Sequence, residues 1–324
     1  MVKIGLIGLG YLGKIHLKLL KEIGNFHISG IYDTDLPTTQ FLAKEYQTKA
    51  FTSLQQLIEE SDAIDIVTPS VTHFKIAKTA LLSGKHIFLE KPATSTVQES
   101  VDLKKLAEEK RLVIQVGHVE RFNPAFIAFK PLLENPDFID CSRLAQYNPR
   151  GTDVSVTHDL MIHDLDLVLS LVKSEITKIE AHGCIQRSLT NDIVTAQLGF
   201  NNGFKATFTA NRNASVNERK IAVFQQNTII EADLLNKSVS VYEYINLHGK
   251  KLNYQDLKNE NSSFKKVINQ TLKIPVSNAI KEELVAFHQC IITATKPVVT
   301  IDDAIDALSL AYRIEEKTLH NISK

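Results

Sequence analysis

Three side chains in this sequence have the chemical types and the spacing that acid–base catalysis requires. Asp159 lies four residues before His163 in a helical pattern, so its carboxylate could orient the imidazole and raise its basicity. Lys91 follows an apolar run, and a partly desolvated lysine has a lowered pKa and can share a proton with a substrate oxygen. The alternatives are a solvated turn at Lys91 and a solvated stripe of a surface helix at Asp159.

Other polar residues near these candidates give weaker or divided signals. Two histidines and a carboxylate at 158–163 make only a weak zinc signature, because the sequence offers no further candidate ligands nearby, and we expect no metal site. Arg121 lies in the segment 117–124 that crosses between the two halves of the chain. Its guanidinium could bind a carboxylate or phosphate, or it could pair with an acid across the domain boundary, and both interpretations stay open.

A glycine-rich turn near the N-terminus has the form of a dinucleotide-binding loop. Three glycines separate an apolar strand at 2–7 from an amphipathic run at 14–23. The first glycine permits the tight turn, the second lets the backbone approach the phosphates, and the third lets helix and strand pack closely. The start of the helix offers unpaired N–H groups to the anion. The cofactor contacts expected here are Gly8, Gly10, Tyr11, Leu12 and Gly13.

An acidic residue after the second strand indicates which dinucleotide is preferred. Asp33 ends an apolar run at 28–32 and lies twenty positions after the last glycine of the turn. Its carboxylate would accept hydrogen bonds from a ribose diol and would repel a 2′-phosphate. Asp35 adds to that repulsion. The sequence therefore predicts NAD (NAD+/NADH) as cofactor, preferred over NADP.

The elements that position these residues follow two different patterns. Through position 117, short apolar runs at 63–68, 86–90 and 112–116 alternate with helical stretches, which predicts βαβ units and a parallel sheet. In such a sheet, ligands bind outside the carboxyl ends of the strands. Two segments that follow strands, 68–70 and 90–92, fall there, and Pro92 could be cis or trans. They add Thr68, Pro69, Ser70, His73, Glu90 and Lys91 to the expected cofactor contacts.

Beyond Pro124 the alternation stops and strands follow one another directly. The predicted strands lie at 179–185, 193–200, 204–210, 221–224 and 228–232, with a hairpin signal at Asn201-Asn202-Gly203. The second domain is therefore expected to be α+β with an antiparallel sheet. A polar segment at 246–263 is predicted to be a loop. Apolar stripes predict two closing helices, one from Ile280 to Ile291 and one from Ile301 to Tyr312.

Length and composition agree with two domains of an ordinary globular protein. The chain has 324 residues, of which 44% are hydrophobic and 23% charged. Lys+Arg and Asp+Glu both number 37, so no overall field favours a nucleic acid or an anionic membrane as partner. We expect no signal peptide and no membrane span. The three cysteines lie far apart, as reduced thiols of a cytoplasmic protein would: Cys141, Cys184 and Cys290.

Together these motifs resemble the glucose-fructose oxidoreductase / inositol dehydrogenase family (Gfo/Idh/MocA). The resemblance implies an α/β Rossmann domain at 1–120, joined by the C-terminal helix at 301–324. It also implies an α+β substrate and oligomerisation domain at 121–300 with a large open antiparallel sheet, and a homodimer or homotetramer formed through that sheet. The matching motifs, in the family's order, are Gly8-x-Gly10-x-x-Gly13, Thr68-Pro69, Glu90-Lys91-Pro92, Arg121-Phe122-x-Pro124 and Asp159-x-x-x-His163-x-x-Asp166.

The resemblance also assigns roles to individual residues. It places Lys91, Asp159 and His163 on the family's catalytic positions. Met161 departs from a frequent glycine and Ser70 from a frequent asparagine, but neither change removes a catalytic group. The substrate contacts it implies are Lys91, Arg121, Asn123, Asp159 and His163.

Two segments, 117–125 and 159–166, are most similar to the UDP-N-acetylglucosamine 3-dehydrogenase branch of the family. This similarity implies an NAD-dependent dehydrogenase that acts on a CH–OH group of a nucleotide sugar, most of all the 3-hydroxyl of UDP-N-acetylglucosamine, in lipid A or surface-glycan biosynthesis. The alternatives are a dehydrogenase of a free sugar or polyol such as inositol, a non-catalytic NAD-binding sensor, and an NADPH-dependent reductase, which Asp33 disfavours. Whether His163 or Lys91 accepts the proton stays open.

Overall fold

The computed structural model describes residues 1–149, 152, 154–245 and 266–319. The predicted polar loop at 246–263 therefore lies outside the described residues. Within them, no helix is both long enough and apolar enough to cross a membrane. Of the three cysteines, Cys141 and Cys290 are buried, Cys184 is exposed, and all three are free thiols.

Two units divide the chain, and each has its own sheet. Unit 1 is Met1–Phe122 with Asn278–Leu308, and unit 2 is Asn123–Ser277 with Ser309–Lys324. The helix α10 (Ile301–Leu319) therefore contributes its first part to unit 1 and its second part to unit 2. The expected division at 120 and 300, into a cofactor domain and a substrate domain, is a division by function and stays a prediction.

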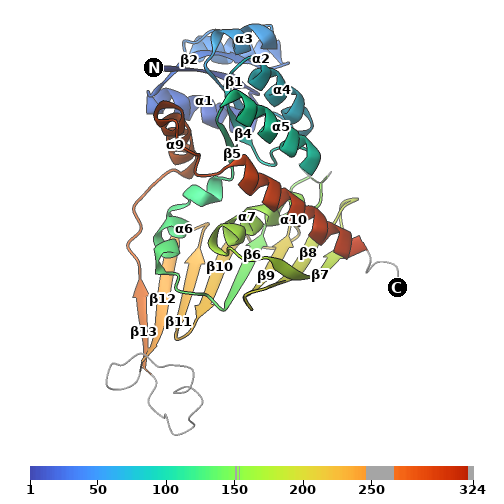
Figure 1. Cartoon of the computed structure of the whole chain (residues 1–324), viewed down its shortest axis with the longest axis vertical. Coiled ribbons are helices and arrows are strands. Elements are labelled where there is room, and N and C mark those ends of the chain that lie inside the picture. The colour runs from blue at the N-terminus through green and yellow to red at the C-terminus, as the bar shows by residue number, and fades with distance from the viewer. Residues whose placement is uncertain (150–151, 153, 246–265, 320–324) are drawn as a thin grey trace. The chain divides into compact units, whose positions relative to one another are not determined.

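The sheet of unit 1 has five parallel strands in the order β2-β1-β3-β4-β5 (Figure 1). The chain moves outward to one side of β1 with β2 and to the other side with β3, so the order reverses between β1 and β3. A crevice at the carboxyl ends is the expected ligand site at such a reversal. The parallel pairing of all five strands confirms the predicted parallel sheet. Its strands are β1 (Val2–Ile7), β2 (Phe26–Tyr32), β3 (Ala63–Ile66), β4 (His86–Glu90) and β5 (Ile114–Gly117).

The strands of the sheet in unit 1 carry apolar residues on both faces, and helices bury these residues. All four residues of β3 are buried. The predicted apolar stripe of the penultimate helix is confirmed, since Leu284 and Phe287 are fully buried and Phe287 packs against Phe88 with ring centroids 5.8 Å apart. The helices are α1 (Tyr11–Ile23), α2 (Leu36–Glu45), α3 (Leu54–Glu60), α4 (Ser70–Leu82), α5 (Val97–Lys110), the 3-10 turn η1 (Val119–Phe122) and α9 (Ala279–Thr293).

The sheet of unit 2 has eight strands in the order β13-β12-β11-β10-β6-β9-β8-β7 (Figure 1). All neighbouring strands are antiparallel except β6 and β9, which pair in parallel. The predicted antiparallel sheet and its hairpin between β8 and β9 are thus confirmed, with one parallel pair added. The strands are β6 (Phe138–Leu144), β7 (Ile176–Cys184), β8 (Ile193–Phe200), β9 (Lys205–Asn211), β10 (Glu218–Gln225), β11 (Thr228–Asp233), β12 (Ser238–Ile245) and β13 (Lys266–Thr271).

Helices of unit 2 pack their apolar sides onto one face of this sheet (Figure 1). The buried core joins Phe126, Leu165 and Ile314 of three helices to inward-facing strand residues such as Phe208. On the same strands, every second residue is less buried, as expected of a sheet with one buried face. The helices are α6 (Pro124–Phe129), the 3-10 turn η2 (Lys130–Leu132), the π-helix η3 (Thr157–Met161), α7 (Ile162–Leu171) and the second part of α10.

Candidate active site

A cavity of about 670 Å³ lies in unit 1 at the carboxyl ends of the first four strands. It contains most of the predicted cofactor contacts from both the glycine turn and the strand ends. Those that line it are Gly8, Gly10, Tyr11, Leu12, Asp33, Thr68, Pro69, Glu90 and Lys91. Residues that the sequence analysis did not name also line it, namely Ile7, Tyr32, Thr34, Val67, Thr72 and Ile76.

The glycine turn fits a dinucleotide pyrophosphate. Gly8 has a φ of +97°, and a side chain there would collide with the Val67 carbonyl. A side chain at Gly13 would collide with the Gly8 carbonyl, whereas the space around Gly10 is open. No side chain caps the start of α1, so its first N–H groups remain for an anion.

Asp33 is fixed at the wall of this cavity. Its Oδ2 accepts a hydrogen bond from the Leu9 N–H at 2.6 Å, and its Oδ1 accepts one from the Asp35 N–H at 2.9 Å. The carboxylate is therefore tied to the glycine turn, where an adenosine ribose would lie if the pyrophosphate binds at α1. Asp35 instead caps α2 through Thr38, whose hydrogen bonds lower the pKa of Asp35, and it does not line the cavity.

His73 lies behind the cavity wall. Its Nε2 is 2.8 Å from the Thr68 carbonyl and its Nδ1 is 3.0 Å from the Pro92 carbonyl. The Lys91-Pro92 peptide bond is cis. Burial lowers the pKa of His73, so the neutral ring donates to one carbonyl at a time. We expected a cofactor contact, but neither His73 nor Ser70 lines the cavity; His73 instead links two segments of its wall.

The catalytic candidates of unit 2 lie where a π-helix meets an α-helix. Asp159 belongs to η3 and His163 to the first turn of α7, and both are half-buried. The sequence spacing predicts an uninterrupted α-helical stripe, whereas the π turn winds the residues around Asp159 more widely. Such turns are frequent at functional sites. Asp166, on the predicted polar stripe, is buried.

Buried polar contacts anchor these two helices within unit 2. Arg143 of β6 forms a bidentate ion pair with Asp164, with Nε–Oδ2 at 3.0 Å and Nη2–Oδ1 at 2.7 Å. At the start of η3, the Glu315 carboxylate of α10 accepts hydrogen bonds from the hydroxyls of Thr157 and of Ser155, which precedes this helix by two residues, both at 2.7 Å. Neither the Arg143–Asp164 ion pair nor the Glu315 hydrogen bonds were predicted from the sequence. The sequence feature that could have indicated the ion pair is the carboxylate of Asp164 directly beside His163.

Two family profiles match this chain. The profile described as "Oxidoreductase family, NAD-binding Rossmann fold" matches residues 2–118, and the one described as "GFO/IDH/MocA C-terminal domain" matches residues 139–231. The chain belongs to the Gfo/Idh/MocA family. Both groups of candidate residues, those around the cavity and those in η3 and α7, fall inside the matched segments.

Individual relatives are similar over most of the chain. A UDP-N-acetylglucosamine 3-dehydrogenase from Acidithiobacillus ferrooxidans is 34% identical over 242 residues, which cover 74% of this chain and 77% of that protein. A solved structure of UDP-N-acetylglucosamine 3-dehydrogenase from the same organism has a TM-score of 0.87 at 28% identity and covers 98% of this chain and 97% of that chain. A Lactobacillus casei scyllo-inositol dehydrogenase with bound NAD(H) and scyllo-inositol shares the fold, with a TM-score of 0.80 at 20% identity, covering 99% of this chain and 98% of that chain.

Family membership confirms the predicted fold class and the predicted enzyme class. This Gfo/Idh/MocA chain is an oxidoreductase of the CH–OH dehydrogenase type, with an NAD-binding Rossmann domain. The named relatives include a scyllo-inositol 2-dehydrogenase (NAD(+)) from Bacillus subtilis, 28% identical over 197 residues, 57% of this chain and 58% of that protein. The family therefore includes both nucleotide-sugar and polyol dehydrogenases.

Two predicted substrate contacts have structural partners in this family member. Arg121 pairs with Asp303, with Nη2–Oδ1 at 3.4 Å. Both residues belong to unit 1, so this acid does not lie across the boundary between the units. Asn123 caps α6 by accepting the Ala125 N–H at 3.0 Å and donates from Nδ2 to the Leu234 carbonyl at 2.9 Å. Their contacts with substrate stay predictions.

Proposed function

We propose that this chain oxidises a secondary alcohol of a nucleotide sugar by hydride transfer to NAD+, and that the alcohol is the 3-hydroxyl of UDP-N-acetylglucosamine. The observation that carries the chemistry is Lys91, which lines the cavity at the glycine turn beside Glu90. The substrate is supported by the 34% identical relative that bears this name. The product would serve lipid A or surface-glycan biosynthesis.

The cofactor in this proposal is NAD rather than NADP. The backbone of the glycine turn and the start of α1 would hold the pyrophosphate. The fixed Asp33 carboxylate would accept the ribose hydroxyls and repel a 2′-phosphate. When bound, NAD+ supplies the acceptor for the hydride, and the protein supplies orientation and charge.

Three side chains carry the acid–base work in this proposal. His163 takes the proton of the sugar hydroxyl, and Asp159 orients the imidazole and stabilises its charged form. Lys91 stabilises the alkoxide as hydride leaves the carbon. Lys91 belongs to unit 1 and the other two to unit 2. Single variants of Lys91 and of His163, each assayed for kcat, separate the two roles.

The quaternary state and location complete the proposal. The eight-stranded sheet buries one face in its own unit and alternates exposed residues on the same strands. We propose a homodimer or homotetramer that associates through this sheet, in the cytoplasm. Light scattering after gel filtration measures the mass in solution, and a monomeric mass would contradict the assembly.

The test of the function is NADH formation from a panel of alcohols. UDP-N-acetylglucosamine and other UDP-sugars are compared with free inositol and glucose, with an aminotransferase present to remove the ketone product. We expect activity with the UDP-sugar and little with free polyols. Activity on free polyols alone would support the second candidate, favoured by the relatives named inositol dehydrogenases. NAD binding without activity on any alcohol would support a sensor.

A further inference from the structure

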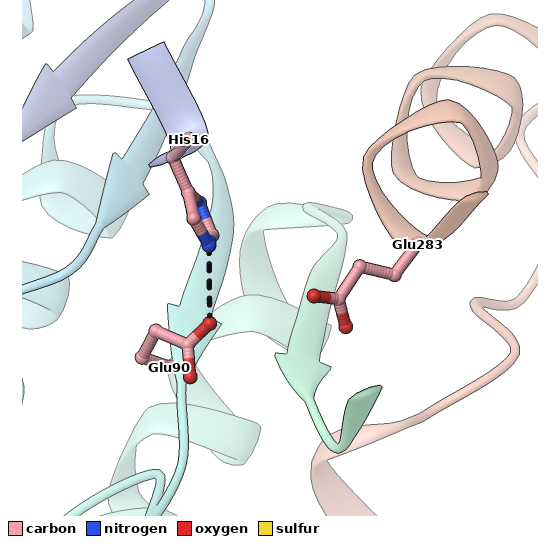
Figure 2. Close-up of side chains that lie close together, drawn as sticks. All are labelled: His16, Glu90 and Glu283. Atoms are coloured by element: carbon pink, nitrogen blue, oxygen red, sulfur yellow. Dashed lines mark ion pairs between the residues drawn. The ribbon is translucent and has the colours of Figure 1, made fainter. Parts of the chain in front are cut away.

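Four ionisable side chains meet inside unit 1, behind the wall of the cofactor cavity. His16 of α1 lies between two carboxylates, with Nδ1 at 2.9 Å from Asp65 Oδ2 and Nε2 at 3.3 Å from Glu90 Oε1. Figure 2 shows Glu283 of α9 beside this pair, with its carboxyl group on the side of α9 that faces them. Single atoms of His16, Glu90 and Glu283 lie within 4.8 Å of one another.

Two carboxylates flank the ring of His16 and favour its charged form. Nδ1 forms a hydrogen bond with Asp65 Oδ2 at 2.9 Å, whereas Nε2 lies 3.3 Å from Glu90 Oε1 in an ion-pair contact without hydrogen-bond geometry. Burial opposes this charge, but the carboxylates of Asp65 and Glu90 outweigh burial and raise the pKa of His16 well above its usual value. Burial also raises the pKa of Asp65.

Glu283 cannot be a second ordinary counter-ion in this cluster. Its side chain is fully buried, and among the described residues neither carboxyl oxygen has a hydrogen-bond partner. Three carboxylates around one imidazolium would leave an excess of negative charge away from water, which is very costly. Burial, together with the charge of Glu90, raises the pKa of Glu283 well above its usual value. A neutral Glu283 reduces this excess, leaving two carboxylates beside one imidazolium, and gains an O–H donor.

The cluster reaches the cavity through Glu90. Glu90 lines that cavity, and its Oε2 accepts a hydrogen bond from the Lys91 N–H at 3.2 Å. The carboxylate also packs against Gly117, where an added side chain would come within 2.8 Å of Glu90 Oε1. The orientation of Glu90 is therefore set by its neighbours, and the backbone of Lys91 is tied to it.

We propose that His16 and Glu283 are positioning residues for Lys91. A charged His16 fixes the orientation of the Glu90 carboxylate, and a neutral Glu283 packs beside this pair without adding another negative charge. The inference rests on the proposed function, because it assumes that Lys91 acts in the reaction. The competing interpretation is a divalent cation bound by His16, Glu90 and Glu283, with Asp65 orienting the imidazole. The two interpretations predict opposite results for a neutral residue at position 283.

The first test is Glu283→Gln, with Glu282→Gln as the matched control from the exposed side of the same helix. A carboxyl group whose pKa is raised by folding binds its proton more tightly in the folded chain, so stability falls as pH rises above about 4.3. Glutamine cannot titrate. We expect Glu283→Gln to keep the neutral-pH melting temperature and to lose less stability than wild type or the control as pH rises above about 4.3.

Other outcomes of this test overturn the inference. A large loss of melting temperature at pH 7 with an unchanged pH slope would mean that Glu283 is ionised in the folded chain. A divalent metal found by elemental analysis of the wild type and lost from Glu283→Gln would mean a cation site. These readings use the chain alone, so they hold even if the proposed substrate is wrong.

The second test is His16→Gln, with the exposed His27→Gln as its control, assayed on whichever alcohol the wild type oxidises. We expect kcat to fall about 10- to 100-fold, because Lys91 is misplaced rather than removed. The KM for NAD+ should change by less than about twofold, and the pH profile of kcat should shift. An unchanged kcat and pH profile, or a higher KM for NAD+ at normal kcat, would contradict the positioning role.

Discussion

Lys91 carries the first prediction at the scale of single residues. Replacing Lys91 by alanine removes the ammonium group from the cavity but leaves the glycine turn and Asp33 in place. We expect kcat to fall about 100- to 10,000-fold while NAD+ binding, followed by fluorescence titration, stays close to wild type. Lys75→Ala, an exposed lysine of α4, is the control. Near-normal turnover in Lys91→Ala would contradict the role.

Asp33 carries a second residue-scale prediction, on cofactor choice. Asp33→Asn removes the negative charge and keeps an oxygen that can accept the Leu9 N–H. We expect the preference for NAD+ over NADP+, measured as the ratio of kcat/KM values, to fall about tenfold because the repulsion of the 2′-phosphate is lost. Asp35→Asn should have a smaller effect, since Asp35 does not line the cavity. An unchanged ratio in Asp33→Asn would remove the electrostatic argument.

At this scale the sequence predicted correctly which residues with recognisable local spacing lie at the cavity. The glycine turn, Asp33 and Lys91 are each recognisable within a few residues, and all of them belong to the cavity or its frame. The cluster of His16 and Glu283 was not predicted, because nothing local connects residues so far apart in the chain. In the sequence, His16 and Glu283 look like ordinary polar residues, and only the fold shows that both are buried. His73 is also buried, which explains why its ring contacts backbone carbonyls and does not line the cavity.

At the scale of elements, the ion pair of Arg143 and Asp164 holds α7 on the sheet of unit 2. Both side chains are almost fully buried. Asp164→Asn leaves the guanidinium charge buried without its counter-charge, and we expect a loss of about 3 to 5 kcal/mol in the free energy of unfolding. The double variant Arg143→Met/Asp164→Leu should lose less, since no charge remains. Asp140→Asn, on the exposed side of β6, is the control for urea denaturation.

The connection between β7 and β8 carries a prediction on acid stability. Asp192 is fully buried and accepts the backbone N–H groups of Gln186, Arg187 and Ser188. Burial alone would raise the pKa of Asp192, but these donors and the Ser188 hydroxyl outweigh it and lower the pKa to about 2.

A carboxyl group with a depressed folded pKa stabilises the protein above its unfolded pKa of about 3.9, and this stabilisation is lost as pH falls towards 2. Asp192→Asn should therefore cost about 2 kcal/mol at pH 7 and flatten the decline of stability between about pH 4 and pH 2. Glu175→Gln, an exposed acid directly before β7, should leave that decline unchanged. An unaltered acid limb in Asp192→Asn would contradict the assignment.

Sequence patterns predicted most of the helices and strands but not the π-helical turn that contains Asp159. The strands at β4 and β8 were predicted at their observed bounds, because apolar periodicity and turn residues define them. The strand β6 was not named, and its parallel pairing with β9 depends on partners far apart in the chain. The π turn at Asp159 was also missed, since the same residues fit an α-helical spacing and the difference is set by packing.

At the scale of the whole molecule, the proposed catalytic residues are distributed over both units. The cavity at the glycine turn, which Lys91 lines, belongs to unit 1, whereas Asp159 and His163 belong to unit 2. The helix α10 is shared, because Ile301 and Ala304 are buried in the core of unit 1 and Ile314 in that of unit 2. The order of motifs along the chain predicted both folds. It could not predict the bounds of the two units, which depend on where α9 and α10 pack.

The transfer of a labelled hydrogen tests the central claim most directly. UDP-N-acetylglucosamine with deuterium on carbon 3 is oxidised by the wild-type chain with NAD+, and the reduced cofactor is analysed by mass spectrometry. The proposed function predicts that the reduced cofactor carries the deuterium, and that the same sugar labelled on carbon 4 gives unlabelled NADH. Unlabelled NADH from the 3-deuterated sugar, or no NADH at all, would contradict oxidation of the 3-hydroxyl by this protein.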